Sequence, residues 1–190
     1  TAIWMGLGLL IYAGYSKQKE AEKLEEEAPR VVVEEAPTHR PYTVLVPVAN
    51  PDTVDQLMHT AIDLARENDG EIVVMNVVTV PQQTPLSEGR AFVPEHREVL
   101  DRAMAIGEAA DVPTSGSIRI GHDVAKAILN TIDQRGADAV LLGWRGRKRR
   151  EDFVFGSNVD EVITKATCDV LVERLGEPVE HVEDILLPVG

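Results

Sequence analysis

The chain has 190 residues and 44% of them are apolar, which is enough to bury the core of one domain of ordinary size. Thirty-two Asp and Glu against nineteen Lys and Arg give a formal net charge of -13, which argues against general nucleic-acid binding. The single cysteine, Cys168, excludes an intrachain disulfide and a metal site built from cysteines.

The N-terminal residues 2–15 form an uncharged apolar run that Lys17 and Lys19 follow. As a helix this run would span only ~21 Å, against a hydrocarbon core of ~30 Å, so it is too short to cross a membrane alone. A signal peptide carries its positive charges before the apolar run, not after it. Because the chain starts at Thr1 without a methionine, we interpret residues 1–16 as the cytoplasmic end of a transmembrane helix that begins before this sequence. An apolar helix packed on the domain is the alternative.

Residues 17–40 are predicted to be a charged linker. Several glutamates and lysines could extend a solvated helix, and Pro29, the valine run 31–33 and Pro37 then break that pattern.

From Tyr42 onward, strand patterns alternate with helix patterns. The strands are predicted at residues 42–48, 71–79, 116–120, 138–143 and 169–173, and the helices at residues 52–68, 95–110, 123–134 and 158–166. This alternation predicts an α/β domain, a parallel sheet with helices on both faces. The segment 81–94, rich in Pro, Gln and Ser, is predicted to be a long loop, either a lid or, as we prefer, a tolerated insertion.

The most informative motif follows the fourth predicted strand. Gly143 and Gly146 are separated by two residues, and nine residues then lead to Gly156 and Ser157 at the start of a predicted helix. Glycines allow the main chain to approach an anion closely, and the first N–H groups of a helix are unpaired donors at the positive end of its dipole. The motif therefore indicates a phosphate-binding turn at the edge where parallel sheets bind ligands.

This Gly-x2-Gly-x9-Gly-Ser spacing resembles the nucleotide-binding branch of the universal stress protein family. Residues 42–48, 71–79 and 169–173 also resemble the family's first, second and last strands, so the likeness covers residues 41–175. The resemblance implies a Rossmann-like, doubly wound, five-stranded parallel sheet with strand order 3-2-1-4-5. It also implies an adenine nucleotide, ATP or AMP with or without Mg²⁺, as the ligand, and no metal site in the chain itself.

Transferring the family's binding positions to this sequence assigns the ends of the first and second strands to the nucleoside and the glycine motif to the ribose and phosphates. The implied site residues are Pro47, Val48, Ala49, Val77, Leu142, Gly143, Arg145, Gly146, Gly156, Ser157, Asn158 and Val159. One position departs from the family, because an acidic residue usually follows the Pro-x of the first strand and this chain has Ala49 and then Asn50. A missing charge-assisted hydrogen bond would cost ~1.5 to 3 kcal/mol, so we expect weakened binding.

The loop inside the motif is basic. It contains Arg145, Arg147, Lys148, Arg149 and Arg150. These cations could contact the phosphates, bind anionic lipid headgroups, or simply be solvated.

No catalytic constellation is present in the sequence. The histidines are scattered, no Walker Gly-Lys-Ser/Thr follows the motif, and Ser157 is better suited to capping a helix and donating to a phosphate than to nucleophilic attack. We therefore expect a sensor and not an enzyme. The alternatives are a dimerisation scaffold of the same fold that binds no nucleotide, and a slow ATPase.

The C-terminal residues 184–190 repeat the form of residues 43–49, a strand that ends in Pro-Val. Residues 182–190 are therefore interpreted as the start of a second, truncated domain of the same kind, with an edge strand or a loose tail as the alternative. In the resembling family, paired domains of this kind are fused to amino-acid or cation transporters, and we expect the attached transporter to resemble an amino-acid permease. We expect a membrane-attached regulatory domain on the cytoplasmic side whose partner is a second such domain, in the same chain or in a homodimer formed through the last strand.

Overall fold

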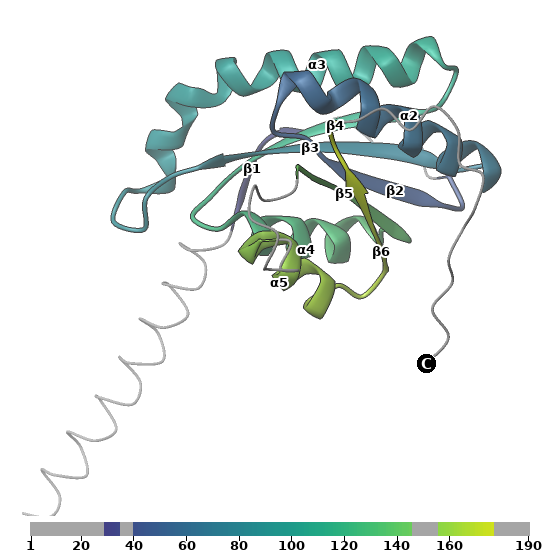
Figure 1. The fold of residues 1–190 in the computed structure, drawn as a ribbon. Helices are drawn as coiled ribbons and strands as arrows, with labels where there is room; N and C mark the ends of the chain where they lie inside the picture. The colour runs from purple at the N-terminus through teal and green to yellow at the C-terminus, as the bar shows by residue number, and fades with distance from the viewer. Residues whose placement is uncertain (1–28, 35–39, 146–155, 177–190) are drawn as a thin grey trace, which may run out of the picture.

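The computed structural model describes residues 29–34, 40–145 and 156–176. Within these residues, six strands form one sheet in the order β1-β4-β3-β2-β5-β6 (Figure 1). The strands are β1 (Arg30–Glu34), β2 (Thr43–Pro47), β3 (Glu71–Thr79), β4 (Thr114–Gly121), β5 (Ala139–Trp144) and β6 (Asp169–Arg174). The pairs β2–β3, β2–β5, β3–β4 and β5–β6 are all parallel. The predicted α/β fold and its strand order 3-2-1-4-5 are confirmed for the five strands from Thr43 onward.

The helices cover both faces of this sheet. Figure 1 shows α2 (Pro51–Glu67) and α3 (Val93–Ala109) above it, with α4 (Val124–Arg135) and α5 (Ser157–Lys165) below. Alternate residues of each strand pack into two separate hydrophobic cores, one on each face of the sheet. Ile72 and Val74 of β3 pack with α2 and α3, whereas Val73 and Met75 pack on the side of α4. This alternation follows from the two-residue period of a strand that is buried on both faces.

The sixth strand, β1, lies within the segment that we assigned to a linker. Its residues pair antiparallel with β4, with Arg30 opposite Ile120 and Glu34 opposite Ser117, and the register shifts between Val31 and Val33. β-branched residues favour an extended backbone, and the edge of β4 offers unpaired ladder groups to any strand that reaches it. The antiparallel direction brings the chain into the sheet at the carboxyl end of β4.

The segment 81–94, predicted to be a loop, contains a short 3-10 helix, η1 (Leu86–Phe92). Leu86 is buried, and a Cβ at Gly89 would come 2.5 Å from Cγ2 of Ile120 and 3.1 Å from Cγ1 of Val80. The segment is therefore packed tightly onto the ends of β3 and β4, which is the arrangement expected of a structural insertion and not of an open lid.

The remaining domain predictions concern residues outside the described part of the chain. They are the apolar run 1–16, residues 17–28 and 35–39 of the linker, and the second-domain start 182–190. Among the described residues, no helix is both long and apolar enough to cross a membrane.

Candidate functional site

The carboxyl end of β2 forms the nucleoside side of the predicted site. Pro47 is half-buried, Val48 is buried and Ala49 is exposed. The N–H of Val48 donates to the carbonyl of Met75 at 2.8 Å, and the carbonyl of Val48 accepts from Nδ2 of Asn76 at 2.7 Å. Both backbone polar groups of Val48 are thus held by β3, which directs the chain outward at Ala49.

Asn50 is the N-cap residue of α2. Its Oδ1 accepts from the backbone N–H of Asp52 at 2.9 Å, and its own backbone is extended, as expected of an N-cap residue. Pro51 occupies the first helical position, where its missing N–H costs nothing. The side-chain oxygen that could have replaced the family's acidic residue is therefore already engaged in capping α2.

β5 runs parallel to β2 and pairs with it at Val44–Ala139 and Leu45–Val140, so the carboxyl ends of both strands lie at the same edge of the sheet. Leu142 is buried on the face of α4 and α5. A Cβ at Gly143 would collide with Cδ1 of Leu175 and would lie 3.2 Å from Cδ1 of Leu57. The close packing of Leu175 therefore favours a glycine at position 143, independently of any ligand. Sequence reasoning had assigned this glycine only to ligand approach.

The start of α5 supplies the phosphate side. Gly156 is the N-cap with φ 129° and ψ 153°, a conformation that L-residues rarely adopt, and no atom of the described residues lies within 4 Å of a Cβ built on it. Ser157 and Asn158 are exposed in the first turn, and Val159 packs against the core below the sheet. Their N–H groups have no partner inside the helix, as at any helix start. The helix begins one residue earlier than predicted, so Gly156 and not Ser157 is the N-cap.

An acidic residue also reaches this turn. Oδ2 of Asp160 lies 3.4 Å from the backbone N of Gly156, so its carboxylate accepts from the first donor of the turn that was predicted to bind phosphate. A carboxylate near a helix N-terminus stabilises the helix, and it also repels a phosphate that approaches the same donors.

Two other predicted positions complete the edge. Val77, near the end of β3, is half-buried against the core below the sheet. Arg145 is exposed after β5, and its guanidinium lies 4.0 Å from Oδ2 of Asp52, a pair too exposed to hold the loop firmly. Gly146 and the basic residues 147–150 lie outside the described residues.

Three polar residues near the site were missed by sequence reasoning: Asn76, His96 and Arg119. Asn76 is 1% exposed inside the apolar strand β3, and Oδ1 of Asn76 lies 2.5 Å from Nδ1 of His96 on α3. Arg119 is fully buried in β4 opposite Val77. For Asn76 and Arg119 the available signal was a polar residue interrupting a buried apolar run, because buried polar groups are kept where they have partners. His96 lies among charged residues and gave no such signal.

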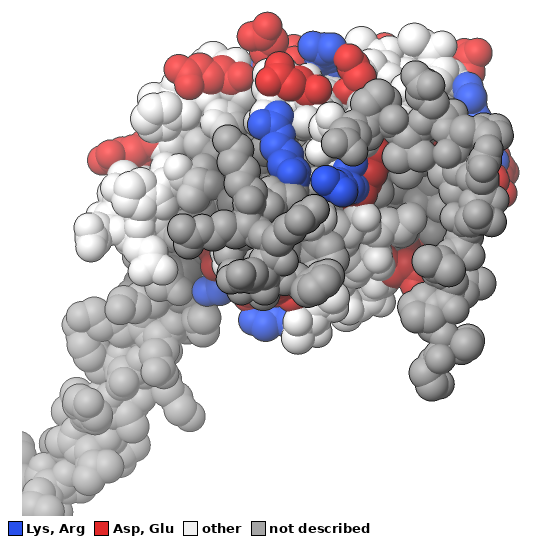
Figure 2. Space-filling model, viewed as in Figure 1, with Lys and Arg blue, Asp and Glu red and all other residues white. Residues whose placement is uncertain are grey.

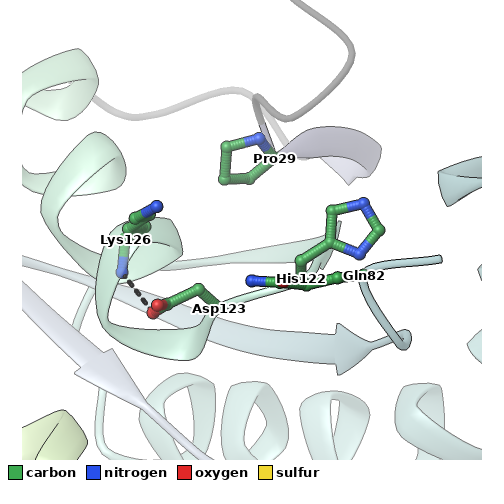
Figure 3. A pocket seen from close by; sticks show the side chains of 5 residues that line it. All are labelled: Pro29, Gln82, His122, Asp123 and Lys126. Carbon is green, nitrogen blue, oxygen red and sulfur yellow. Dashed lines mark hydrogen bonds between the residues drawn. The ribbon is translucent and has the colours of Figure 1, made fainter. Parts of the chain in front are cut away.

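A small pocket lies further along the same edge, beyond the end of β4. Figure 3 shows Lys126, His122 and Gln82 around it, with Pro29 on the side of β1. Asp123 caps α4 by accepting from the backbone N–H of Lys126 at 3.0 Å, the dashed line in the figure. The cavity volume of about 40 Å³ admits water molecules but is far below what a nucleotide needs.

The charge on the surface is uneven. Figure 2 shows acidic side chains gathered along the top of the view, where Figure 1 places α3, and Lys and Arg side chains in the middle of the view below them. The exposed carboxylates of α3 are those of Glu95, Glu98, Asp101 and Glu108. The candidate phosphate side at α5 lies on the opposite face of the sheet, which separates it from this acidic band.

Two groups with raised pKa values, Cys168 and Tyr42, lie near the amino ends of β6 and β2, away from the candidate site. Burial raises the pKa of the Cys168 thiol, and the carboxylates of Asp169 and Asp138 raise it further. Tyr42 has its pKa raised for the same reasons, again with burial as the largest cause. A thiol held protonated is a poor nucleophile. In the described part of the chain, no three His, Cys, Asp or Glu side chains are grouped so that they could hold a metal ion.

A family model, related sequences and solved structures all point to the same protein family. A family model described as the universal stress protein family matches residues 42–174. Over 144 residues the chain is 26% identical to universal stress protein YxiE of Bacillus subtilis, covering 69% of this chain and 97% of that protein. A structure of the universal stress protein from Archaeoglobus fulgidus in complex with dAMP matches with a TM-score of 0.56 and 21% identity, over 69% of this chain and 96% of that one. At this identity the match shows the shared fold.

A longer relative is also similar. Over 152 residues the chain is 28% identical to a protein named Na(+)/H(+) antiporter NhaS5 from Synechocystis sp., covering 78% of this chain and 21% of the antiporter. The chain thus spans about a fifth of the length of this relative.

Proposed function

Since this chain belongs to the universal stress protein family, we propose that its domain binds an adenine nucleotide between the carboxyl ends of β2 and β5, and that occupancy regulates an attached membrane transporter. The observation that carries the proposal is the turn at Gly156, where a positive φ, with no described atom within 4 Å of a Cβ, precedes the donors of α5. A backbone of this form can meet a phosphate without a steric obstacle.

Each part of the site has a defined task in this proposal. The N–H groups of Ser157 and Asn158 donate to phosphate oxygens, the base packs on Val77, and the cation of Arg145 adds attraction for the phosphates. Pro47, Val48 and Ala49 flank the nucleoside, Leu142 and Gly143 follow the base and ribose, and Gly146 and Val159 complete the turn. The dAMP complex of the similar Archaeoglobus fulgidus protein supports an adenine nucleotide as the ligand.

A scaffold that binds no nucleotide is the second candidate. Asn50 is engaged as the N-cap of α2, so its side-chain oxygen is not available to accept from the nucleoside. Asp160 accepts from the N–H of Gly156, so that donor is not available to a phosphate. In that case the domain would act through pairing with a second such domain.

The proposed regulation needs no catalysis. A nucleotide shifts an equilibrium only by its differential affinity for two states, so ATP or AMP must bind one arrangement of the attached domains better than the other. We propose a sensor on the cytoplasmic side of a membrane, attached through residues 1–16 and followed by a second domain that begins at residues 182–190. The similarity to a Na(+)/H(+) antiporter favours a cation transporter over an amino-acid permease as the attached protein.

Calorimetric titration of ATP, ADP and AMP into the 190-residue chain tests nucleotide binding. Gly156→Asp places a charge and a side chain in the turn, and we expect it to abolish micromolar binding. Gly136→Asp is the matched control, because Gly136 also has a positive φ and open space but caps the far end of α4. Wild-type chain that is folded and gives no heat at millimolar nucleotide would favour the scaffold.

Flotation with liposomes of phosphatidylcholine tests the membrane attachment. Lipid without net charge excludes binding through the basic loop, so flotation of the wild-type chain reports on the apolar run. The Leu9→Glu variant places a charge in that run and is expected to stay at the bottom of the gradient. Wild-type chain that does not float contradicts attachment through residues 1–16.

A further inference from the structure

A chain of hydrogen bonds joins α3 to the nucleoside side of the site. His96, in the first turn of α3, contacts Oδ1 of Asn76 through Nδ1 at 2.5 Å, and Nδ2 of Asn76 donates to the carbonyl of Val48 at 2.7 Å. Asn76 is 1% exposed, so its amide has no access to bulk water. Val48 immediately precedes Ala49, where the chain leaves the sheet.

The directions of these bonds follow from the donor and acceptor inventory. The carbonyl of Val48 can only accept, so the atom of Asn76 that faces it must be the amide nitrogen. The oxygen of the amide then faces His96, and Nδ1 of His96 must carry the proton in order to donate to it. Reversing the amide would bring two oxygens together at Val48. The carbonyl of Val48 therefore sets which way the amide of Asn76 points, and the hydrogen bond from Nδ1 of His96 stabilises that orientation.

Among the described residues, no backbone N–H of β3 donates to the carbonyl of Val48, because the pairing of β2 with β3 ends at Pro47 and Met75. β3 continues to Thr79, while β2 has already turned toward α2. The side chain of Asn76 thus extends the pairing of the two strands by one carbonyl, at the last buried position before the site.

We propose that His96 is a positioning residue of the nucleotide site, which acts by stabilising the orientation of Asn76 and thereby fixing the backbone at Val48 and Ala49. This inference rests on the proposed function, because the nucleotide site is itself proposed there. It also gives the inserted segment a role: η1 is packed against Val80 and Ile120, leads directly into α3, and so sets where His96 lies. His96 does not contact the ligand in this proposal.

The test compares two substitutions at His96 in the ¹⁵N-labelled 190-residue chain. His96→Phe keeps a ring of similar shape and removes the donor, whereas His96→Asn restores an N–H near the position of Nδ1. His59→Leu is the matched control, because His59 is exposed on α2. The readouts are proton exchange of the Asn76 side-chain amide without ligand, and the affinity for AMP and ATP by calorimetry.

We expect His96→Phe to accelerate exchange of the Asn76 amide and to weaken nucleotide binding about tenfold, equivalent to ~1.4 kcal/mol. His96→Asn should recover most of both effects, and His59→Leu should change neither. A purely structural role would lower the melting temperature of His96→Phe and leave its affinity at the wild-type value, which would overturn the proposal.

A measurement on the wild-type chain adds an independent test. The ¹⁵N shifts of the His96 ring should show a protonated Nδ1, and a neutral ring with the proton on Nε2 alone would refute the proposed orientation of Asn76. Should the wild-type chain bind no nucleotide, the proposed function fails, and amide exchange in His96→Phe still decides whether His96 holds the backbone at Val48.

Discussion

Oδ1 of Asn50 accepts a hydrogen bond from the backbone N–H of Asp52 at 2.9 Å, so the residue that follows Ala49 caps α2. The same side chain cannot offer that lone pair to a nucleoside without giving up the cap. With the nucleoside beside Ala49, as proposed, substitutions at Asn50 test the stability of α2, and substitutions at Ala49 test the affinity for the ligand.

Asn50→Ala should destabilise the chain by ~1 kcal/mol, because it removes the acceptor for one of the first N–H groups of α2. For a chain of this size the melting temperature should fall by ~2 to 4 °C. Asn50→Asp keeps an acceptor at the same place and is expected to melt at or above the wild-type temperature. Differential scanning calorimetry measures the melting temperatures. If Asn50→Ala and the wild-type chain melt at the same temperature, the cap contributes nothing to stability.

Ala49→Asp should strengthen nucleotide binding about 10- to 100-fold, because a carboxylate at this position can accept a charge-assisted hydrogen bond worth ~1.5 to 3 kcal/mol. Adenosine is a better probe than ATP, since it carries no phosphates for the new charge to repel. Ala91→Asp, at an exposed alanine of η1, is the control for added charge. If adenosine binds both variants equally in calorimetric titrations, the nucleoside does not lie beside Ala49.

Gly143→Ala should destabilise the domain by ~1 to 3 kcal/mol, because its methyl group would overlap Cδ1 of Leu175 and press on Leu57. Leu175→Ala removes the nearest atoms. The double variant should therefore lose less stability than the sum of the two single losses. Urea denaturation of the four chains gives the interaction energy, and strict additivity would contradict the contact.

Cys168 should react with iodoacetamide more slowly in the folded chain than in the unfolded chain at pH 8. Burial raises the pKa of this thiol and Asp169 raises it further, so less thiolate is present at a given pH in the folded state. The midpoint of the rate against pH should lie higher in the folded chain. Asp169→Asn removes a negative charge and should move that midpoint down, which mass spectrometry of timed samples can follow. A midpoint below that of the unfolded chain would contradict the raised pKa.

The sequence by itself determined the five parallel strands and the four helices between them. Strands buried on both faces are continuous apolar runs, and helices have their own period and caps, so these elements depend on neighbours along the chain. The order of the strands came from the resemblance of whole segments and the glycine motif to a known family. The spacing of the 143–157 motif was also local information, and it placed the start of α5 to within one residue.

Only the tertiary structure decided the features that depend on residues far apart in the sequence. The valine run 31–33 becomes β1 because the edge of β4 is available to it. Gly143 leaves room for the side chain of Leu175, which follows β6. The contact between Asn76 and His96 depends on where the inserted segment starts α3. Such relationships arise from register and packing, which bring distant side chains to a few ångströms of each other, and no local pattern encodes them.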